Sequence, residues 1–157
     1  QMCIRDRLSV GVRAPWWVQA GFDEYATRLP SSWTLALKEI QPAIRGKSGN
    51  ADVFRRHEAE SLMASVKPGH RLIALDLKGR TLSTAQLASR LDGFRHDLSG
   101  LQLMIGGADG LDESCLEQAD ERWCLSSLTF PHFLVRVIIA EQIYRAWTIL
   151  NHHPYHR

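Results

Sequence analysis

Apolar residues recur along the chain with two different periods, and segments of the two kinds follow one another. Short apolar or alternating runs, typical of strands, occupy residues 8–12, 33–40, 71–77, 101–107 and 122–128. Runs with helical spacing occupy residues 16–29, 51–66, 83–98, 111–120 and 133–150. Because strands alternate with helices, the pattern predicts an α/β fold in which a parallel sheet is flanked by helices.

Two prolines and a serine mark where several of these elements begin and end. Pro30 is expected to close the first helix, and Ser83 to be the N-cap of the third. The last helix is entered through Pro131. The sequence contains no internal repeat and no linker, so we expect a single domain over residues 1–157.

Composition narrows the class of protein without naming a function. The 157 residues are 45% hydrophobic and 23% charged, as in an ordinary globular protein, and the net charge is only +2. Contact with nucleic acid would therefore use a local patch rather than a basic tail. The longest apolar run, FLVRVIIA, is interrupted by Arg136 and is too short to cross a bilayer. We expect a cytoplasmic protein with no membrane partner.

The cysteines and the first residues add two further expectations. Cys3, Cys115 and Cys124 have neither the spacing of a metal site nor that of a disulfide framework, and a reducing compartment is the simplest interpretation. The opening QMCIRDR matches the translation of a DNA adapter used to prepare sequencing libraries. We therefore expect residues 1–7 to be non-native and to carry no function.

Three of the predicted strands run into loops rich in glycine or small polar residues, in LIALDLKG, LMIGGADG and CLSSLTFPH. In a parallel sheet, ligands bind beyond the carboxyl ends of the strands, at a topological switch point, so these loops predict a ligand site. IGGADG lacks the glycine spacing of a dinucleotide fingerprint; its glycines either admit a ligand close to the backbone or supply a turn. LSSLTFPH either wraps a flat base or simply connects strand to helix.

Ionisable residues are concentrated on the last helix and in the tail. His132 and Arg136 are four residues apart, so both can face one way, and Arg136 needs a partner or an interface because its neighbours are apolar. Glu141 and Arg145 have the spacing of an ordinary solvated pair. The tail, NHHPYHR, is either mobile or packed against a site; its histidines match no zinc pattern, so no metal is expected.

Taken together, LDLKG, LMIGGADGL, LSSLTFPHFLVRVIIAEQIYRAW and NHHPYHR resemble one family, the bacterial 23S rRNA pseudouridine-N3 methyltransferases of the SPOUT class. The resemblance extends from Val10 to Arg157. It implies a C-terminal deep trefoil knot, S-adenosyl-L-methionine as cofactor, and a homodimer with the active site at the subunit boundary. It also implies methylation of N3 of a pseudouridine in 23S rRNA on the assembled ribosome. The alternatives are another RNA substrate, such as tRNA, and a non-catalytic RNA-binding factor in ribosome assembly.

The resemblance also implies roles for individual residues. The cofactor would be held by Leu75, Gly106, Leu125, Ser126, Ser127, Leu128, Thr129 and Phe130. Leu75 and Leu128 would flank the adenine. The candidates for catalysis are His132, Arg136, Tyr155 and His156. Arg136 would hold a phosphate or a developing oxyanion, Tyr155 would stack on or hydrogen-bond the base, and His156 would take the proton.

Further expectations concern the tail, the dimer and the RNA. The tail would cover the cofactor pocket of its own subunit or of its neighbour. The last helix would supply much of the dimer boundary through Ile138, Ile139, Ile143, Tyr144 and Trp147. Phosphates of the RNA would be contacted by Arg45, Lys47, Arg55 and Arg56.

Overall fold

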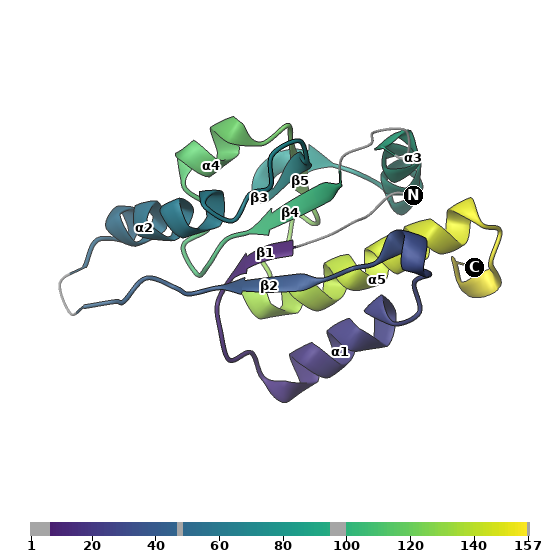
Figure 1. Ribbon diagram of the computed structural model, residues 1–157, viewed down its shortest axis with the longest axis horizontal. Helices are drawn as coiled ribbons and strands as arrows, with labels where there is room; N and C mark the ends of the chain where they lie inside the picture. The colour runs from purple at the N-terminus through teal and green to yellow at the C-terminus, as the bar shows by residue number, and fades with distance from the viewer. Residues whose placement is uncertain (1–6, 47–48, 95–99, 157) are drawn as a thin grey trace.

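The protein is described by a computed structural model that covers residues 7–46, 49–94 and 100–156 (Figure 1). Its strands are β1 Arg7–Val10, β2 Leu37–Ile40, β3 Arg71–Thr81, β4 Leu101–Ile105 and β5 Glu121–Cys124. Its α-helices are α1 Trp16–Ala26, α2 Ala51–Met63, α3 Thr84–Gly93, α4 Glu113–Gln118 and α5 His132–Leu150. Two short 3-10 turns, η1 and η3, span Ser31–Trp33 and Pro154–His156. Of the segment predicted to be non-native, residues 1–6 lie outside the described residues, and Arg7 begins β1.

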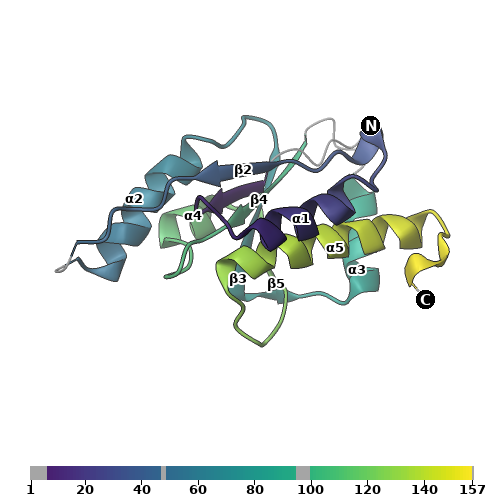
Figure 2. The ribbon, with the colours of Figure 1, turned by 90° about the horizontal axis from the view of Figure 1, so that it is seen from below.

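The strands form one sheet in the order β2-β1-β4-β3-β5, and every neighbouring pair is parallel. The prediction of a parallel sheet flanked by helices is therefore confirmed. Helices α1, α3 and α5 cover one face, and α2 and α4 cover the other (Figures 1 and 2). The side chains of β4 alternate between the two cores: Leu101, Leu103 and Ile105 pack with α5, whereas Met104 packs with α2 and α4.

Local sequence explains where several elements begin and end. Ser83 accepts a hydrogen bond from the Gln86 backbone N–H, and the Gln86 side chain accepts one from the Ser83 N–H, which forms a capping box at the start of α3. This confirms the predicted N-cap. The strand predicted over residues 33–40 begins only at Leu37, because Pro30 leads into η1 at Ser31–Trp33.

Strand β3 is longer than its apolar run predicts, because it pairs with β5 twice. Trp123 lies opposite both Leu75 and Arg80, so residues 76–79 bulge out of the ladder between them. A side chain at Gly79 would bring its Cβ within 2.6 Å of the Trp123 carbonyl carbon. The bulge therefore needs a glycine where it returns to the sheet, and it directs the segment after Leu75 away from the strand.

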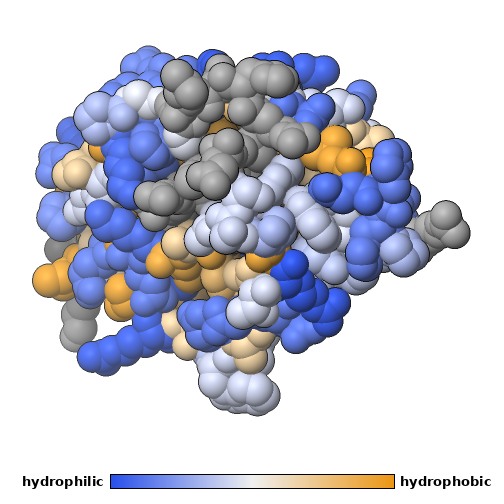
Figure 3. All heavy atoms as spheres, turned by 45° about the vertical axis from the view of Figure 1, so that its right-hand side comes forward, coloured by the Kyte–Doolittle hydropathy of each residue, from blue (hydrophilic) through white to orange (hydrophobic). Residues whose placement is uncertain are grey.

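The surface of the molecule is mainly polar where Figure 3 shows it, with hydrophobic residues gathered in small patches. In the described part of the chain, no helix combines the length and the apolar character that a membrane span requires.

Candidate functional site

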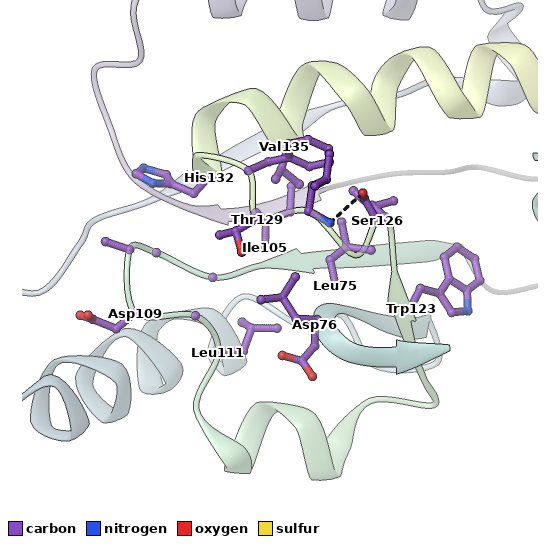
Figure 4. A pocket seen from close by; sticks show the side chains of 18 residues that line it. Leu75, Asp76, Ile105, Asp109, Leu111, Trp123, Ser126, Thr129, His132 and Val135 are labelled. Carbon is purple, nitrogen blue, oxygen red and sulfur yellow. Dashed lines mark hydrogen bonds between the residues drawn. The ribbon is translucent and has the colours of Figure 1, made fainter. Parts of the chain in front are cut away.

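A cavity of about 380 Å³ opens at the bulge of β3 and at the carboxyl ends of β4 and β5 (Figure 4). The three segments that sequence analysis singled out all contribute to its wall, so their predicted convergence is confirmed. The lining residues are Leu75, Asp76, Leu77, Ile105, Gly106, Gly107, Ala108, Asp109, Gly110, Leu111, Trp123, Leu125, Ser126, Leu128, Thr129, Phe130, His132 and Val135.

The glycines of the loop after β4 have both of the roles that the sequence left open: they form a tight turn, and they leave backbone accessible to a ligand. Gly110 has a φ of 81°, a conformation that glycine adopts without strain, and its N–H donates to the Gly107 carbonyl oxygen at 3.1 Å. A Cβ at Gly106 would lie 2.4 Å from the Gly110 carbonyl carbon. A Cβ at Gly110 would meet nothing within 4 Å, so a ligand in the cavity can approach that part of the backbone.

Residues outside the predicted motifs contact the glycine-rich loop after β4 on the side away from the cavity. The Asp109 carboxylate pairs with Arg45, at 2.6 Å between Nη2 and Oδ2. Glu58 on α2 is buried, and its Oε1 accepts a hydrogen bond from the Ala43 N–H at 3.1 Å. Because Glu58 Oε2 lies 2.9 Å from the position of a Cβ on Gly107, α2 and the loop before it form the rear support of the glycine-rich loop.

The loop between β5 and α5 forms the opposite wall. Leu125, Ser126, Leu128, Thr129 and Phe130 line the cavity, whereas Ser127 is exposed and is not among the lining residues. The Leu128 N–H donates to the Ser126 hydroxyl at 3.0 Å, which bends the loop so that the Leu128 side chain remains 67% exposed at the rim of the cavity.

His132 stands at the start of α5, on the same side of the cavity as Asp109 (Figure 4). Partial burial lowers the pKa of its imidazole below the ordinary value, and the charges of Arg136 and Arg45 lower the pKa further. The ring is therefore neutral at neutral pH and has a nitrogen free to accept a proton.

Arg136 is placed away from the cavity, in the core between α5 and the sheet. Its side chain is 0% exposed and donates from Nε to Ser9 Oγ at 2.9 Å, from Nη1 to Glu39 Oε1 at 2.7 Å and from Nη2 to the Gly11 carbonyl oxygen at 2.6 Å. The partner expected for Arg136 is thus a set of hydrogen-bonding groups on β1, on β2 and in the turn after β1. Within this chain, Arg136 supports the start of α5, where His132 lies.

Tyr155 and His156 lie at the opposite end of α5 from the cavity. Helix α5 has 19 residues and is about 28 Å long. The Tyr155 ring meets Tyr144 edge-on at 4.8 Å, and its hydroxyl donates to Glu141 Oε1 at 3.2 Å. The tail is therefore packed rather than mobile. Its contacts with α5 begin at Glu141, nine residues or about 14 Å past His132, and none of its described residues lines the cavity of its own subunit.

Burial and the neighbouring Tyr25 and Glu141 raise the pKa of Tyr155 to about 12, so the phenol remains protonated. His156 Nδ1 is buried and has no hydrogen-bond partner among the described residues. The Glu141 carboxylate binds both Tyr155 and Arg145, with 2.8 Å between Arg145 Nε and Glu141 Oε1. The predicted solvated pair is thus part of the packing that anchors the tail.

Several lining residues were not predicted from the sequence, among them Asp76, Ile105, Trp123 and Val135. Asp76 is the one acidic residue of the predicted strand 71–77 and lies near its carboxyl end, where parallel sheets place ligand-binding groups, and this signal could have found it. Trp123 and Val135 have the pattern of ordinary core residues, so no sequence signal separates them from the core.

The cavity suits S-adenosyl-L-methionine, which has a flat base, a sugar, an amino-acid end and a sulfonium cation. Its volume lies within the range of roughly 300–1,000 Å³ usual for small-molecule sites. Leu75, Ile105 and Leu128 provide apolar walls for a base, and the glycine-rich loop provides approachable backbone groups. The Asp76 carboxylate in the lining is compatible with a cationic ligand. The residues present therefore fit the cofactor.

A parallel sheet with a cofactor-sized cavity at its carboxyl edge is the arrangement of the class of α/β proteins that bind small ligands at a topological switch point. The chain belongs to the SPOUT methyltransferase family, because the family model described as "Predicted SPOUT methyltransferase" matches residues 6–156. Membership implies the C-terminal trefoil knot and a methyltransferase that uses S-adenosyl-L-methionine.

Similar proteins from several bacteria are each named "Ribosomal RNA large subunit methyltransferase H". The protein from Hydrogenovibrio crunogenus (strain DSM 25203 / XCL-2) is 49% identical over 148 residues, 94% of this chain and 95% of the relative. The protein from Nitrosococcus oceani is 51% identical over 150 residues, 96% of both chains. The protein from Pseudomonas putida (strain GB-1) is 49% identical over 152 residues, 96% of this chain and 97% of the relative.

Proposed function

We propose that this protein transfers the methyl group of S-adenosyl-L-methionine to N3 of a pseudouridine in 23S rRNA, acting in the cytoplasm on the assembled ribosome. Relatives about half identical over nearly the whole chain are named as methyltransferases of the large-subunit ribosomal RNA. The observation that carries the proposal is the meeting of the IGGADG and LSSLTFPH loops at one cavity with His132 at its edge.

The cofactor supplies a methyl group that its sulfonium already activates. The protein therefore needs to bind the cofactor, orient the pseudouridine and deprotonate its N3. Leu75 and Leu128 enclose the adenine between apolar surfaces, and main-chain groups near Gly106 and Leu125 bind its polar edges. Ser126, Thr129 and Phe130 complete this wall. Ser127 is left out of the cofactor site, since its exposed side chain is not part of the cavity wall.

His132 accepts the proton of the imide nitrogen, because its imidazole is neutral and borders the cavity. Arg136 acts as a positioning residue: its three hydrogen bonds fix the first turns of α5 to β1 and β2. With the base fixed at the edge of the cavity, the nucleophilic nitrogen can be held in line with the methyl group.

The tail acts on the cavity of a partner subunit in a homodimer. The described tail residues do not line the cavity of their own subunit, and Tyr155 holds His156 in a packed turn through Tyr144 and Glu141. His156 of the partner subunit then borders the RNA-facing side of the site and can share in proton transfer. Tyr155 is assigned to positioning rather than to base stacking, since its ring and hydroxyl are already engaged.

Apolar residues surround α5, which is the pattern of a helix that is covered on all sides. Ile139, Ile143 and Tyr144 are at most 5% exposed and pack within their own subunit, so their predicted part in the dimer boundary is wrong. Ile138 and Trp147 are half-buried, and we assign the dimer contact to them.

RNA phosphates are contacted by arginines near the cavity. Arg45 lies beside the glycine-rich loop, and Arg56 is exposed on α2. Arg55 pairs with Asp52 on the same helix and contributes less. Lys47 falls outside the described residues.

Transfer of a labelled methyl group to ribosomes tests the proposal. Ribosomes from a strain that lacks this methylation should accept one methyl group in 23S rRNA, whereas ribosomes that also lack the pseudouridine should accept none. Labelling of tRNA instead would favour the related RNA substrate. Tight cofactor binding with no transfer to any RNA would favour a non-catalytic assembly factor.

A further inference from the structure

Two tryptophans open helix α1, and the first of them is largely in solvent. Trp16 is 82% exposed and Trp17 is 45% exposed, whereas Trp33 and Trp123 are buried in the core. Tryptophan is highly buried on average in folded proteins, so an indole this exposed calls for an explanation.

Trp16 lies at the same end of the molecule as the cavity. A Cβ on Gly11 would lie 3.0 Å from His132 Nε2, so the turn that leads into α1 packs directly against the proposed base. A Cβ on Gly21 would lie 3.1 Å from the Val137 side chain. Helices α1 and α5 therefore run side by side in the same direction, with their N-termini at the carboxyl edge of the sheet (Figures 1 and 2).

The surroundings of Trp16 favour a negatively charged partner. Arg13 is exposed, and within the part of the chain that the structure describes its side chain forms no ion pair. The first turn of α1 contains no acidic residue, and no side chain caps it. Asp23 lies farther along the helix, where it accepts a hydrogen bond from Gln19.

We propose that Trp16 and Arg13 form a binding surface for a single-stranded segment of the substrate RNA next to the nucleotide that enters the cavity. This inference rests on the proposed function, which makes RNA the ligand on this side of the molecule. One base stacks on the Trp16 indole, and Arg13 contacts a neighbouring phosphate. Stacking is tolerant of sequence, so this surface orients the RNA strand, while the cavity selects the nucleotide.

The surface is tested by binding of a uridine-rich RNA of about ten nucleotides to the full chain. Replacing Trp16 with alanine (W16A) should weaken the affinity about tenfold, and W16F should restore most of it because phenylalanine still offers an aromatic face. The RNA should quench tryptophan fluorescence in the wild type but much less in W16F. The control is V53A on α2, which removes another exposed apolar side chain, 60% exposed, and should leave RNA affinity unchanged.

The salt dependence separates the two contacts. R13A should weaken RNA binding and lower the slope of log K against log salt concentration by about 0.7, the value for one phosphate contact on a single strand. W16A should leave that slope unchanged. Equal affinity of wild type and W16A, or a changed slope in W16A, would overturn the assignment.

The alternative is that Trp16 contacts a second copy of the chain. Light scattering excludes this alternative if W16A keeps the oligomeric state of the wild type. Dissociation of the W16A oligomer would instead show that Trp16 belongs to a subunit contact and would overturn the inference. Calorimetry with S-adenosyl-L-methionine and methyl transfer to ribosomes are measured in parallel on the wild type. A wild type that transfers no methyl group would refute the proposed function. The effect of W16A on RNA affinity tests the Trp16–Arg13 surface independently of methyl transfer.

Discussion

Arg136 is the largest of the fully buried side chains in the described part of the protein. The sequence indicated only that a charge among valines and isoleucines needs a partner. Its partners Ser9 and Gly11 are more than 100 positions away in sequence, and Glu39 is nearly as distant, so no local pattern could have named them. The same burial that makes this arginine structural removes it from direct contact with a substrate in the cavity.

Replacing Arg136 with methionine should lower the free energy of unfolding by about 3 kcal/mol. The change leaves Ser9 and the Gly11 carbonyl without their donor in the core and removes the charge that pairs with Glu39. Urea denaturation followed by circular dichroism measures the change. The matched control is Arg55→Met, which breaks a surface pair on α2 and should cost less than about 1 kcal/mol. Equal losses in the two variants would contradict the structural role of Arg136.

His132 should give methyl transfer an acidic limb. Its pKa is lowered in the folded protein, so the neutral base persists as the pH falls to about the ordinary histidine value near 6.5, and transfer should decline only below it. The lowered pKa of His132 also affects stability. Its contribution to the free energy of unfolding is fully present at high pH and is lost as the pH falls from the pKa of the unfolded chain through the lower pKa of the folded protein.

Single-turnover rates measured across pH test this assignment. The variant H132Q should be slower by about 100-fold or more and should lack the acidic limb, while its cofactor affinity stays close to that of the wild type. A full rate with H132Q would assign the base to another residue.

At the scale of elements, the apolar pattern predicted the strands and helices that form the sheet and its two cores, because burial on a sheet face or helix stripe imposes its own period. Differences arise where tertiary contacts intervene. β3 continues to Thr81 because β5 pairs with it on both sides of a bulge, and β2 begins late because η1 precedes it. The convergence of three loops at the cavity followed from the general rule for parallel sheets, while the support that Arg45 and Glu58 give the glycine-rich loop depends on contacts between distant segments.

The glycine-rich loop after β4 should not tolerate a side chain at its first position. G106A would place a Cβ 2.4 Å from the Gly110 carbonyl carbon, so the loop must shift and distort one wall of the cavity. Cofactor affinity, measured by calorimetry, should fall at least about tenfold, or by 1.4 kcal/mol. The control is G93A at the end of α3, where an added Cβ meets nothing within 4 Å and affinity should be unchanged. Normal binding by G106A would show that this loop adapts.

At the scale of the whole molecule, α5 separates the cavity from the packed tail. The helix begins at His132, the proposed base, and ends near the turn that contains His156, so one chain carries the two groups at opposite ends. A homodimer that brings the tail of one subunit to the cavity of the other would resolve this separation, and a symmetric pair would form two equivalent sites.

Mixed dimers test whether the tail acts on the partner subunit. Deleting residues 154–157 should abolish methyl transfer while sparing the dimer, and H132A should abolish transfer with the tail intact. Random mixing of equal amounts of the two chains should restore about a quarter of the wild-type rate, because half of the dimers then contain one complete site. No restoration in mixed dimers that light scattering shows to be intact would place the tail's action within its own subunit.

The sequence by itself determined the α/β class, the order of elements and the loops that build the cavity, because these follow from local periodicity, turn residues and a rule of sheet geometry. Its motifs also carried the family resemblance. Only the tertiary structure decided that Arg136 is a buried support, that the tail packs on Glu141 and Tyr144 instead of lining its own cavity, and that Trp16 stands in solvent beside the site. These depend on packing between segments far apart in the chain, where burial and distance, rather than residue type, decide what each side chain can do.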